Sequence, residues 1–301
     1  MNKNLNVHLK LSGMAALWGV SWVWGRVVAQ SLPPVSASAM RFLLAGTALA
    51  AGLFLMGKFP KLKNLSPKQW LGLTISAFFG VFAYAVCFLT GLKHMPAGEA
   101  AVIISLNPVL IMLLSRLIFK ETITARIGTG MAMAFAGSLI CITRGNPLML
   151  FQQKMGLGQM LILGCVLCWA CYTIVGRFVL KGIDALTVTL ATAWIGGIML
   201  AVTAVAAEPQ PFAWVWQTSD TVWLSLIALA IGSTALAYVW FFEGVKVLGS
   251  GTAGAYITLV PVFGVLSSVA FLGEPLHFSL VSGGILAVCG MLVMYLGKGR
   301  R

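Results

Sequence analysis

Apolar stretches of about 20 residues follow one another almost without interruption along this chain of 301 residues. At 1.5 Å per residue, a helix of that length crosses the hydrocarbon core of a bilayer. Only 9% of the residues are charged, and the mean hydropathy of +0.96 lies far above that of a soluble domain. We therefore expect an all-α membrane protein whose main partner is the lipid bilayer.

Charged or Pro/Gly-rich breaks divide the apolar sequence into ten predicted transmembrane helices. They fall at residues 10–28, 34–56, 69–91, 97–118, 124–142, 157–178, 183–206, 221–242, 250–272 and 277–296. The first stretch, from Leu11 to Val28, continues into further apolar helices rather than ending at a small-residue cleavage site. We interpret it as a retained helix and not as a signal peptide.

The formal net charge of +13 would suggest nucleic-acid binding in a soluble protein, but here the basic residues lie mostly at helix ends. If the amino terminus is cytoplasmic, the ten-helix arrangement puts fifteen Lys and Arg residues on the cytoplasmic side and four on the other. The cytoplasmic set is Lys3, Lys10, Lys58, Lys61, Lys63, Lys68, Arg116, Lys120, Arg126, Arg177, Lys181, Lys246, Lys298, Arg300 and Arg301; the periplasmic set is Arg26, Lys93, Arg144 and Lys154. This asymmetry predicts a multi-pass protein of the inner (plasma) membrane with both termini in the cytoplasm and no nucleic-acid partner.

The second half of the chain repeats the first at an offset of 151 to 153 residues. Trp18, Gly25, Arg26, Gly91, Gly98, Pro108, Glu121, Gly130 and Gly137 match Trp169, Gly176, Arg177, Gly244, Gly251, Pro261, Glu274, Gly283 and Gly290. Five helices cross the membrane an odd number of times, so the second copy starts on the side where the first ends. We expect two inverted five-helix repeats, residues 1–148 and 149–301, an arrangement typical of secondary transporters.

Several short motifs occur in order along both repeats. They are Trp18-Gly19, the run from Arg41 to Gly46, Pro108 followed by Phe119-Lys120-Glu121, and Pro261 followed by the run from Leu272 to Leu276. On these motifs the whole chain resembles the EamA-type members of the drug/metabolite transporter superfamily. The resemblance implies two EamA-like repeats and efflux or exchange of small metabolites such as amino acids, or of drugs, without ATP or a cofactor.

Pro108 and Pro261 fall near the middle of the fourth and ninth predicted helices, at matching positions of the repeats. A proline removes a helix hydrogen bond and frees a carbonyl, and paired interruptions of this kind point to a transporter's binding site. Asn107 adds an amide at bilayer depth that needs a partner. The alternative is that the prolines only shape the packing of the helices.

Aromatic and hydroxyl side chains cluster on several predicted helices. The candidates for lining a substrate cavity are Trp18, Ser21, Trp22, Tyr84, Trp169, Tyr172, Thr173, Tyr238 and Tyr256. Facing inward, they would form a large pocket with few polar groups, suited to small amphipathic metabolites. The alternative is that they lie in interfacial belts or face lipid.

Arg41 lies inside the second predicted helix, where a charge is costly and is usually functional or paired. It could bind a substrate carboxylate. Alternatively, it extends to the membrane surface or pairs with Glu99, and the family resemblance favours such a structural role because arginine is common here whatever the substrate.

The seven acidic residues all lie at helix ends or in loops. Only Glu99 and Glu243, both near an interface, are candidates for binding a coupling ion, so facilitation or exchange stays open. The shortage of acids also disfavours a cationic substrate.

The leading hypothesis is alternating-access export of a small neutral, zwitterionic or anionic molecule, most plausibly an amino acid. A membrane-embedded enzyme would need clustered acids, histidines or a metal site, whereas the three histidines are scattered and the six cysteines behave as small apolar residues within helices. A non-transporting scaffold stays open. Substrate identity and oligomeric state are not specified by the sequence.

Overall fold

A computed structural model describes residues 3–57, 59, 62, 65–146, 155–179 and 183–298. Within these residues the protein is built of helices and contains no strand. The first repeat comprises α1 (Lys3–Ser31), α2 (Pro34–Leu55), α3 (Pro67–Ala77), η2 (Phe78–Ala83), α4 (Tyr84–His94), α5 (Ala97–Ile103), η3 (Ile104–Leu106), α6 (Asn107–Phe119) and α7 (Ala125–Ile142). The second comprises α9 (Leu157–Val179), α10 (Ala185–Ala207), η4 (Ala213–Trp216), α11 (Asp220–Ile227), η5 (Ala228–Leu236), α12 (Ala237–Ile257), α13 (Val260–Leu272) and α14 (Phe278–Lys298).

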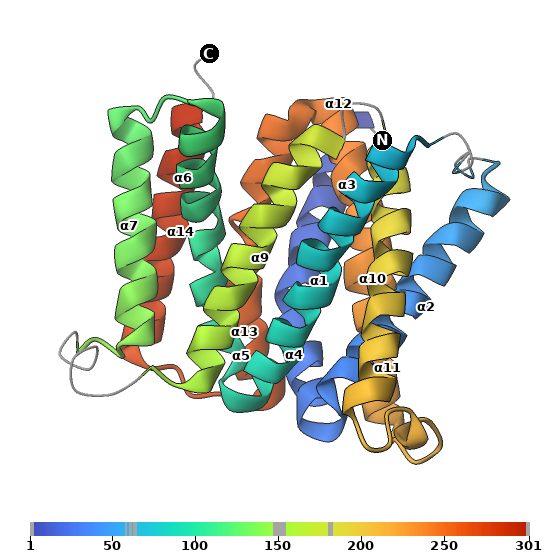
Figure 1. The fold of residues 1–301 in the computed structure, drawn as a ribbon. Coiled ribbons are helices and arrows are strands. Elements are labelled where there is room, and N and C mark those ends of the chain that lie inside the picture. The colour runs from blue at the N-terminus through green and yellow to red at the C-terminus, as the bar shows by residue number, and fades with distance from the viewer. Residues whose placement is uncertain are drawn as a thin grey trace.

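Nine helices of the described chain are long and apolar enough to span a membrane. The predicted first span is not among them, because Arg26 and three tryptophans lower the hydropathy of α1. This helix is nevertheless 29 residues long and runs through the bundle beside the others (Figure 1). With α1 included, the structure confirms the expected all-α membrane fold of two repeats.

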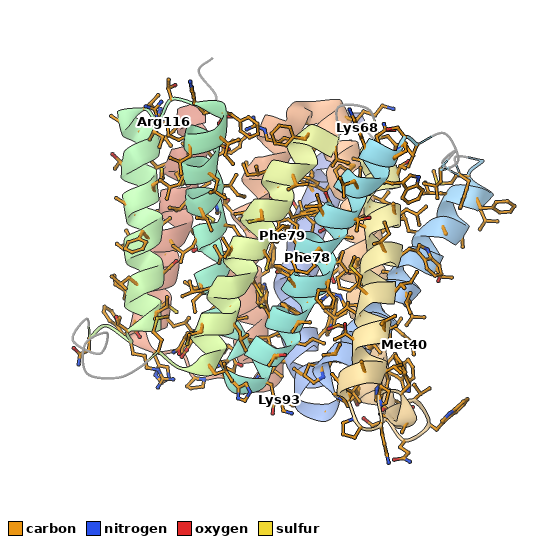
Figure 2. The ribbon with its side chains drawn as sticks, viewed as in Figure 1. Met40, Lys68, Phe78, Phe79, Lys93 and Arg116 are labelled. Carbon is orange, nitrogen blue, oxygen red and sulfur yellow. The ribbon has the colours of Figure 1, made fainter. Side chains whose placement is uncertain are left out.

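The two repeats run in opposite directions. In Figure 1, α1 starts at the top and α7 ends at the bottom, whereas α9 starts at the bottom and α14 ends at the top. Figure 2 shows Lys68 and Arg116 at the top end of the bundle and Lys93 at the bottom. The predicted boundary at residues 148 and 149 lies outside the described residues, as do Lys58, Lys61, Lys63, Lys154, Lys181, Arg300 and Arg301 from the charge count.

Two carboxylates of the second repeat cap two helices of the first. The carboxylate of Glu208 accepts hydrogen bonds from the backbone N–H groups of Val35 and Ser36 at 2.9 and 3.1 Å, at the start of α2. The carboxylate of Glu274 accepts from Ala97 and Gly98 at 2.8 and 2.9 Å, at the start of α5. Negative charge at a helix amino terminus satisfies free N–H groups and opposes the helix dipole. Both contacts therefore hold the repeats together.

The helices α7 and α14 pack through glycines that recur seven residues apart in both repeats. A Cβ atom on Gly137 would lie 2.4 Å from the carbonyl oxygen of Gly283, and one on Gly290 would lie 2.4 Å from the backbone nitrogen of Ala134. Real Cβ atoms do not approach so closely. Small residues thus let the backbones of the fifth and tenth helices touch.

The largest cluster of buried apolar residues lies toward the bottom of the bundle. It includes Val28 of α1 and Leu32 just after it, Leu92 of α4 and Met95 just after it, and Trp214 of η4. These elements meet at the lower end in Figure 1. The bottom of the bundle is therefore closed by tightly packed side chains.

Candidate functional site

A cavity of about 540 Å³ lies between the two repeats. Such a volume is typical of sites for small molecules. Eleven of the cavity candidates expected from the sequence line it: Trp18, Ser21, Trp22, Arg41, Tyr84, Asn107, Pro108, Trp169, Tyr172, Tyr238 and Pro261. The structure thus brings together residues from both copies of the repeat.

Two candidates do not line the cavity, so the expectation for them is wrong. The hydroxyl of Thr173 donates to the carbonyl of Trp169 within α9, at 2.8 Å. The hydroxyl of Tyr256 is hydrogen-bonded to Nδ1 of His8 at 2.7 Å and so connects α12 to α1. Each residue is one position away from a cavity-lining neighbour, and one position rotates a helical side chain by about 100°.

The cavity occupies the upper part of the bundle only. Toward the bottom, its lining stops at Trp22 in α1, Arg41 in α2 and Phe88 in α4. Toward the top, it reaches Thr189 near the start of α10 and Tyr295 near the end of α14. The cavity is therefore one-sided, with the buried cluster described above beneath it.

Four interruptions of regular helix surround the cavity, in two pairs related by the repeat. The third and eighth spanning helices each contain a π-helical segment, η2 and η5. The fourth and ninth are broken immediately before their prolines, by η3 and by the turn at Thr258 and Leu259. Residues from all four interruptions line the cavity. Irregular backbone at membrane depth is tolerated where it faces a cavity, and π-helical segments are frequent at functional sites.

The prolines act differently from the kink expected from the sequence. Pro108 and Pro261 lie in the first turn of α6 and of α13, where a helix needs no N–H donor from that residue. Each proline therefore starts a new helix after a break. The π-helical segments were not expected, because no residue type marks them in the sequence.

Two backbone carbonyl groups of η5 accept hydrogen bonds from side chains. The indole Nε1 of Trp18 donates to the carbonyl of Ser233 at 2.9 Å, and the hydroxyl of Thr234 donates to the carbonyl of Leu229 at 2.9 Å. The hydroxyl of Thr234 also accepts from Nε and Nη2 of Arg41, at 3.3 and 3.2 Å. This segment thus connects α1, α2 and α12 at one wall of the cavity.

Arg41 is buried, with 9% of its surface exposed. The carbon of its guanidinium lies 5.0 Å from the ring centre of Phe42 and 5.3 Å from that of Phe88, a cation–π arrangement. Both structural alternatives for this residue are wrong: the side chain does not reach the surface, and Glu99 pairs instead with Arg144 at 3.2 Å. No ion pair joins Arg41 to a carboxylate of the described chain.

Asn107 carries a polar group without a hydrogen-bond partner. Its side-chain Oδ1 is buried and has no hydrogen-bond partner among the described residues. The residue lies at the start of α6 and lines the cavity. A buried acceptor without a partner is costly, so this amide has a need for a donor that the described residues do not meet.

Aromatic rings form much of the remaining wall. Trp18 meets Tyr238 edge to face with ring centres 5.4 Å apart, Trp22 lies 5.0 Å from Phe88, and Tyr84 lies 5.9 Å from Trp169. Two of these pairs join residues of different repeats. The wall is amphipathic, because tryptophan and tyrosine combine a large apolar face with one polar group.

None of the seven acidic residues of the chain lines the cavity. Glu99 pairs with Arg144, and Glu243 pairs with Lys10 at 2.8 Å. The coupling role of Glu99 and Glu243 stays a prediction. The positive charge of Arg41 is thus not balanced by a carboxylate within the cavity wall.

Comparison with known proteins agrees with this architecture. The family model of EamA-like transporters matches residues 7–143 and 156–296, one match in each half of the chain. A solved crystal structure with 22% sequence identity superposes with a TM-score of 0.69, covering 98% of this chain and 99% of the other. At this level of identity, the superposition supports the fold alone.

Several curated proteins are similar over nearly their full length. The Bacillus subtilis protein "Uncharacterized transporter YyaM" is 28% identical over 96% of this chain and 93% of its own. An uncharacterized transporter of Archaeoglobus fulgidus is 29% identical over 96% of each chain. A Salmonella typhimurium protein named "Probable amino-acid metabolite efflux pump" is 26% identical over 94% of this chain and 93% of its own.

Proposed function

Because the chain belongs to the EamA-like transporter family, we propose that it is a secondary transporter that exports small metabolites, such as amino acids, or drugs by alternating access. The observation that carries this proposal is the one-sided cavity between two inverted repeats. Two related halves can exchange conformations, and the cavity then closes on the side where it was open and opens on the other.

Two ion pairs between the repeats support this exchange of conformations. Arg26 of the first repeat faces Glu274 of the second, with Nε 3.9 Å from Oε1. Arg177 of the second repeat pairs with Glu121 of the first, at 2.6 Å. The repeat offset relates the two pairs, and they lie near opposite ends of the bundle. We propose that the first pair helps to close the bottom in this conformation, whereas the second is already formed here beside the open top.

The top of the bundle is proposed to face the cytoplasm. Of the basic side chains in the described segments, Lys10, Lys68, Arg116, Lys120, Arg126, Arg177 and Lys246 belong to the top, against Arg26, Lys93 and Arg144 at the bottom. Short cytoplasmic loops favour Lys and Arg. On this assignment both termini are cytoplasmic, the protein lies in the inner membrane, and the cavity of this conformation is on the cytoplasmic side, ready to load an export substrate.

The proposed substrate class rests on the volume of the cavity and on the name of one relative. A cavity of about 540 Å³ accepts molecules of amino-acid size, and the name of the Salmonella typhimurium protein refers to amino-acid metabolites. We assign substrate contact to the cavity-lining side chains of Trp18, Arg41, Asn107, Trp169 and Tyr238.

We also propose that the chain divides into two units, residues 1–148 and 149–301, which correspond to the two five-helix repeats.

Two other classes of function are less consistent with these observations. The family and the names of the relatives indicate a transporter rather than an enzyme. A membrane scaffold would leave the cavity and the inverted repeats without a role. Ligand binding without flux would favour the scaffold.

The test is transport by purified protein in proteoliposomes. A panel of labelled amino acids, other small metabolites and drugs is offered from either side, and flux is compared with protein-free liposomes. The matched control is Pro108→Trp, which places a bulky side chain in the cavity. We expect saturable flux of at least one class of compound, lost in the variant. Absence of flux for the whole panel in both directions would refute transport.

A further inference from the structure

We propose that the preferred substrates are organic monoanions: a carboxylate bound by Arg41, attached to a compact apolar or aromatic body. This inference rests on the proposed function, because it assumes that the cavity is the transport site. It concerns the charge of the substrate, which neither the family nor the relatives specify.

The first argument is the unused hydrogen-bonding capacity of Arg41. A guanidinium carries five N–H donors, and here a single hydroxyl, that of Thr234, receives contacts from Nε and Nη2. The donors on Nη1 have no hydrogen-bond partner in the described structure. A buried charge of this kind is normally paired and hydrogen-bonded. A carboxylate fits because its two oxygens can accept two parallel bonds from the guanidinium.

The second argument is the sign of the charge in the cavity. Arg41 is the one charged residue of the cavity lining in the described chain, and all seven acids of the protein lie elsewhere. A bound cation would meet Arg41 without a compensating carboxylate. A bound anion would neutralise it, and a zwitterion would leave its ammonium group with neutral acceptors only. The expected order of preference is therefore anion, then zwitterion, then cation.

The third argument is the surroundings of the guanidinium. Phe42 and Phe88 lie against it at 5.0 and 5.3 Å, which fixes the position of the charge. Trp22 packs on Phe88 with ring centres 5.0 Å apart, and Tyr84 stacks on Phe88 at 6.0 Å. A carboxylate on Arg41 would thus carry its apolar body against aromatic rings.

The test uses four compounds that share one phenyl body. They are 3-phenylpropionate, its neutral amide 3-phenylpropanamide, phenylalanine and 2-phenylethylamine. Uptake into proteoliposomes is measured at pH 8, with protein-free liposomes defining the leak. The carboxylate can form a charge-assisted bidentate contact with Arg41, and the amide cannot. We therefore expect protein-dependent flux of the carboxylate to exceed that of the amide at least about 10-fold. Faster flux of phenylalanine or of 2-phenylethylamine than of 3-phenylpropionate would overturn the proposal.

A variant separates substrate binding from a structural role of the arginine. In Arg41→Gln we expect the ratio of carboxylate flux to amide flux to fall about 10-fold, while Arg41→Lys retains part of it. The matched control is Arg126→Gln, at the start of α7 and outside the cavity, in which the ratio should not change. If Arg41 only supports the fold, Arg41→Gln lowers both fluxes by the same factor, and the proposal fails.

Three further outcomes of these experiments also support or reject the preference for anions. If Arg41→Gln does not fold, the ranking of the four compounds by the unmodified protein is sufficient to support or reject anion preference. Flux of other compounds, without flux of the carboxylate, would reject this inference and leave the transporter intact. No protein-dependent flux of any compound in the larger panel would reject both.

Discussion

Glu274, in the loop between α13 and α14, binds the amino terminus of α5 and faces Arg26 of α1, so that one carboxylate of the second repeat contacts two helices of the first. Its side chain is 12% exposed. The equivalent residue of the first repeat, Glu121, pairs with Arg177 but is 30% exposed. Two residues related by the repeat thus have different surroundings, because this conformation is closed at one end only.

The difference predicts unequal effects of the same substitution. Glu274→Ala removes a mostly buried carboxylate that accepts two backbone hydrogen bonds, and we expect it to lower the free energy of unfolding by about 2 kcal/mol. Glu121→Ala, the matched control, removes a partly exposed ion pair, with an expected loss of at most about 1 kcal/mol. Thermal unfolding in detergent measures both. Equal losses would contradict the assignment of Glu274 to the closed end.

Close packing of α7 on α14 predicts a steric effect. In Gly137→Ala the new methyl group would lie 2.4 Å from the carbonyl oxygen of Gly283, so the helices must separate. We expect a loss of about 1–3 kcal/mol in unfolding free energy and a lower yield of monodisperse protein. Gly128→Ala on the same helix is the control, because its nearest neighbour would be 4.0 Å away. Similar stability of both variants would show that the helices tolerate separation.

The sequence predicts the helices and the repeat well, because both depend on local composition and on matches at a fixed offset. It predicts the position of Trp18 and Trp169 in the cavity for the same reason. It does not predict the surroundings of Arg41, since Thr234 is 193 positions away in the chain. Nor does it separate Tyr256 from Ile257, which line different surfaces although they are adjacent. The π-helical segments depend on tertiary packing and have no residue signature.

Membrane topology provides a direct test of the inverted arrangement. A reporter that is active only in the cytoplasm is fused at residue 150, in a second fusion protein at the carboxyl terminus, and in a third after Lys68. We expect activity for the second and third fusions and none for the first, because five helices separate each terminus from the midpoint. Activity at residue 150 together with activity at the carboxyl terminus would exclude inverted repeats.

Bulky substitution of the two prolines tests the position of the transport pathway. Pro108→Trp and Pro261→Trp fill the cavity from opposite repeats, and we expect each to reduce flux at least about 10-fold while membrane insertion is retained. Pro67→Trp is the control, since Pro67 also lies in the first turn of a helix but is outside the cavity. Flux and size-exclusion profiles are measured together. Unchanged flux in both cavity variants would remove the prolines from the site.

The charge of the substrate predicts how export responds to the membrane potential. Over a complete cycle the charges of the carrier return to their starting positions, so that export of a monoanion moves one net negative charge outward. A potential of 100 mV, negative inside, favours this movement by about 2.3 kcal/mol, roughly a 50-fold concentration ratio. No coupling ion is then needed, in agreement with a cavity wall without acids. Proteoliposomes loaded with 3-phenylpropionate should therefore release it faster when valinomycin and a potassium gradient make the interior negative. Release of the neutral amide should not respond, and a potential-independent release of the carboxylate would show that its charge is compensated by a second ion.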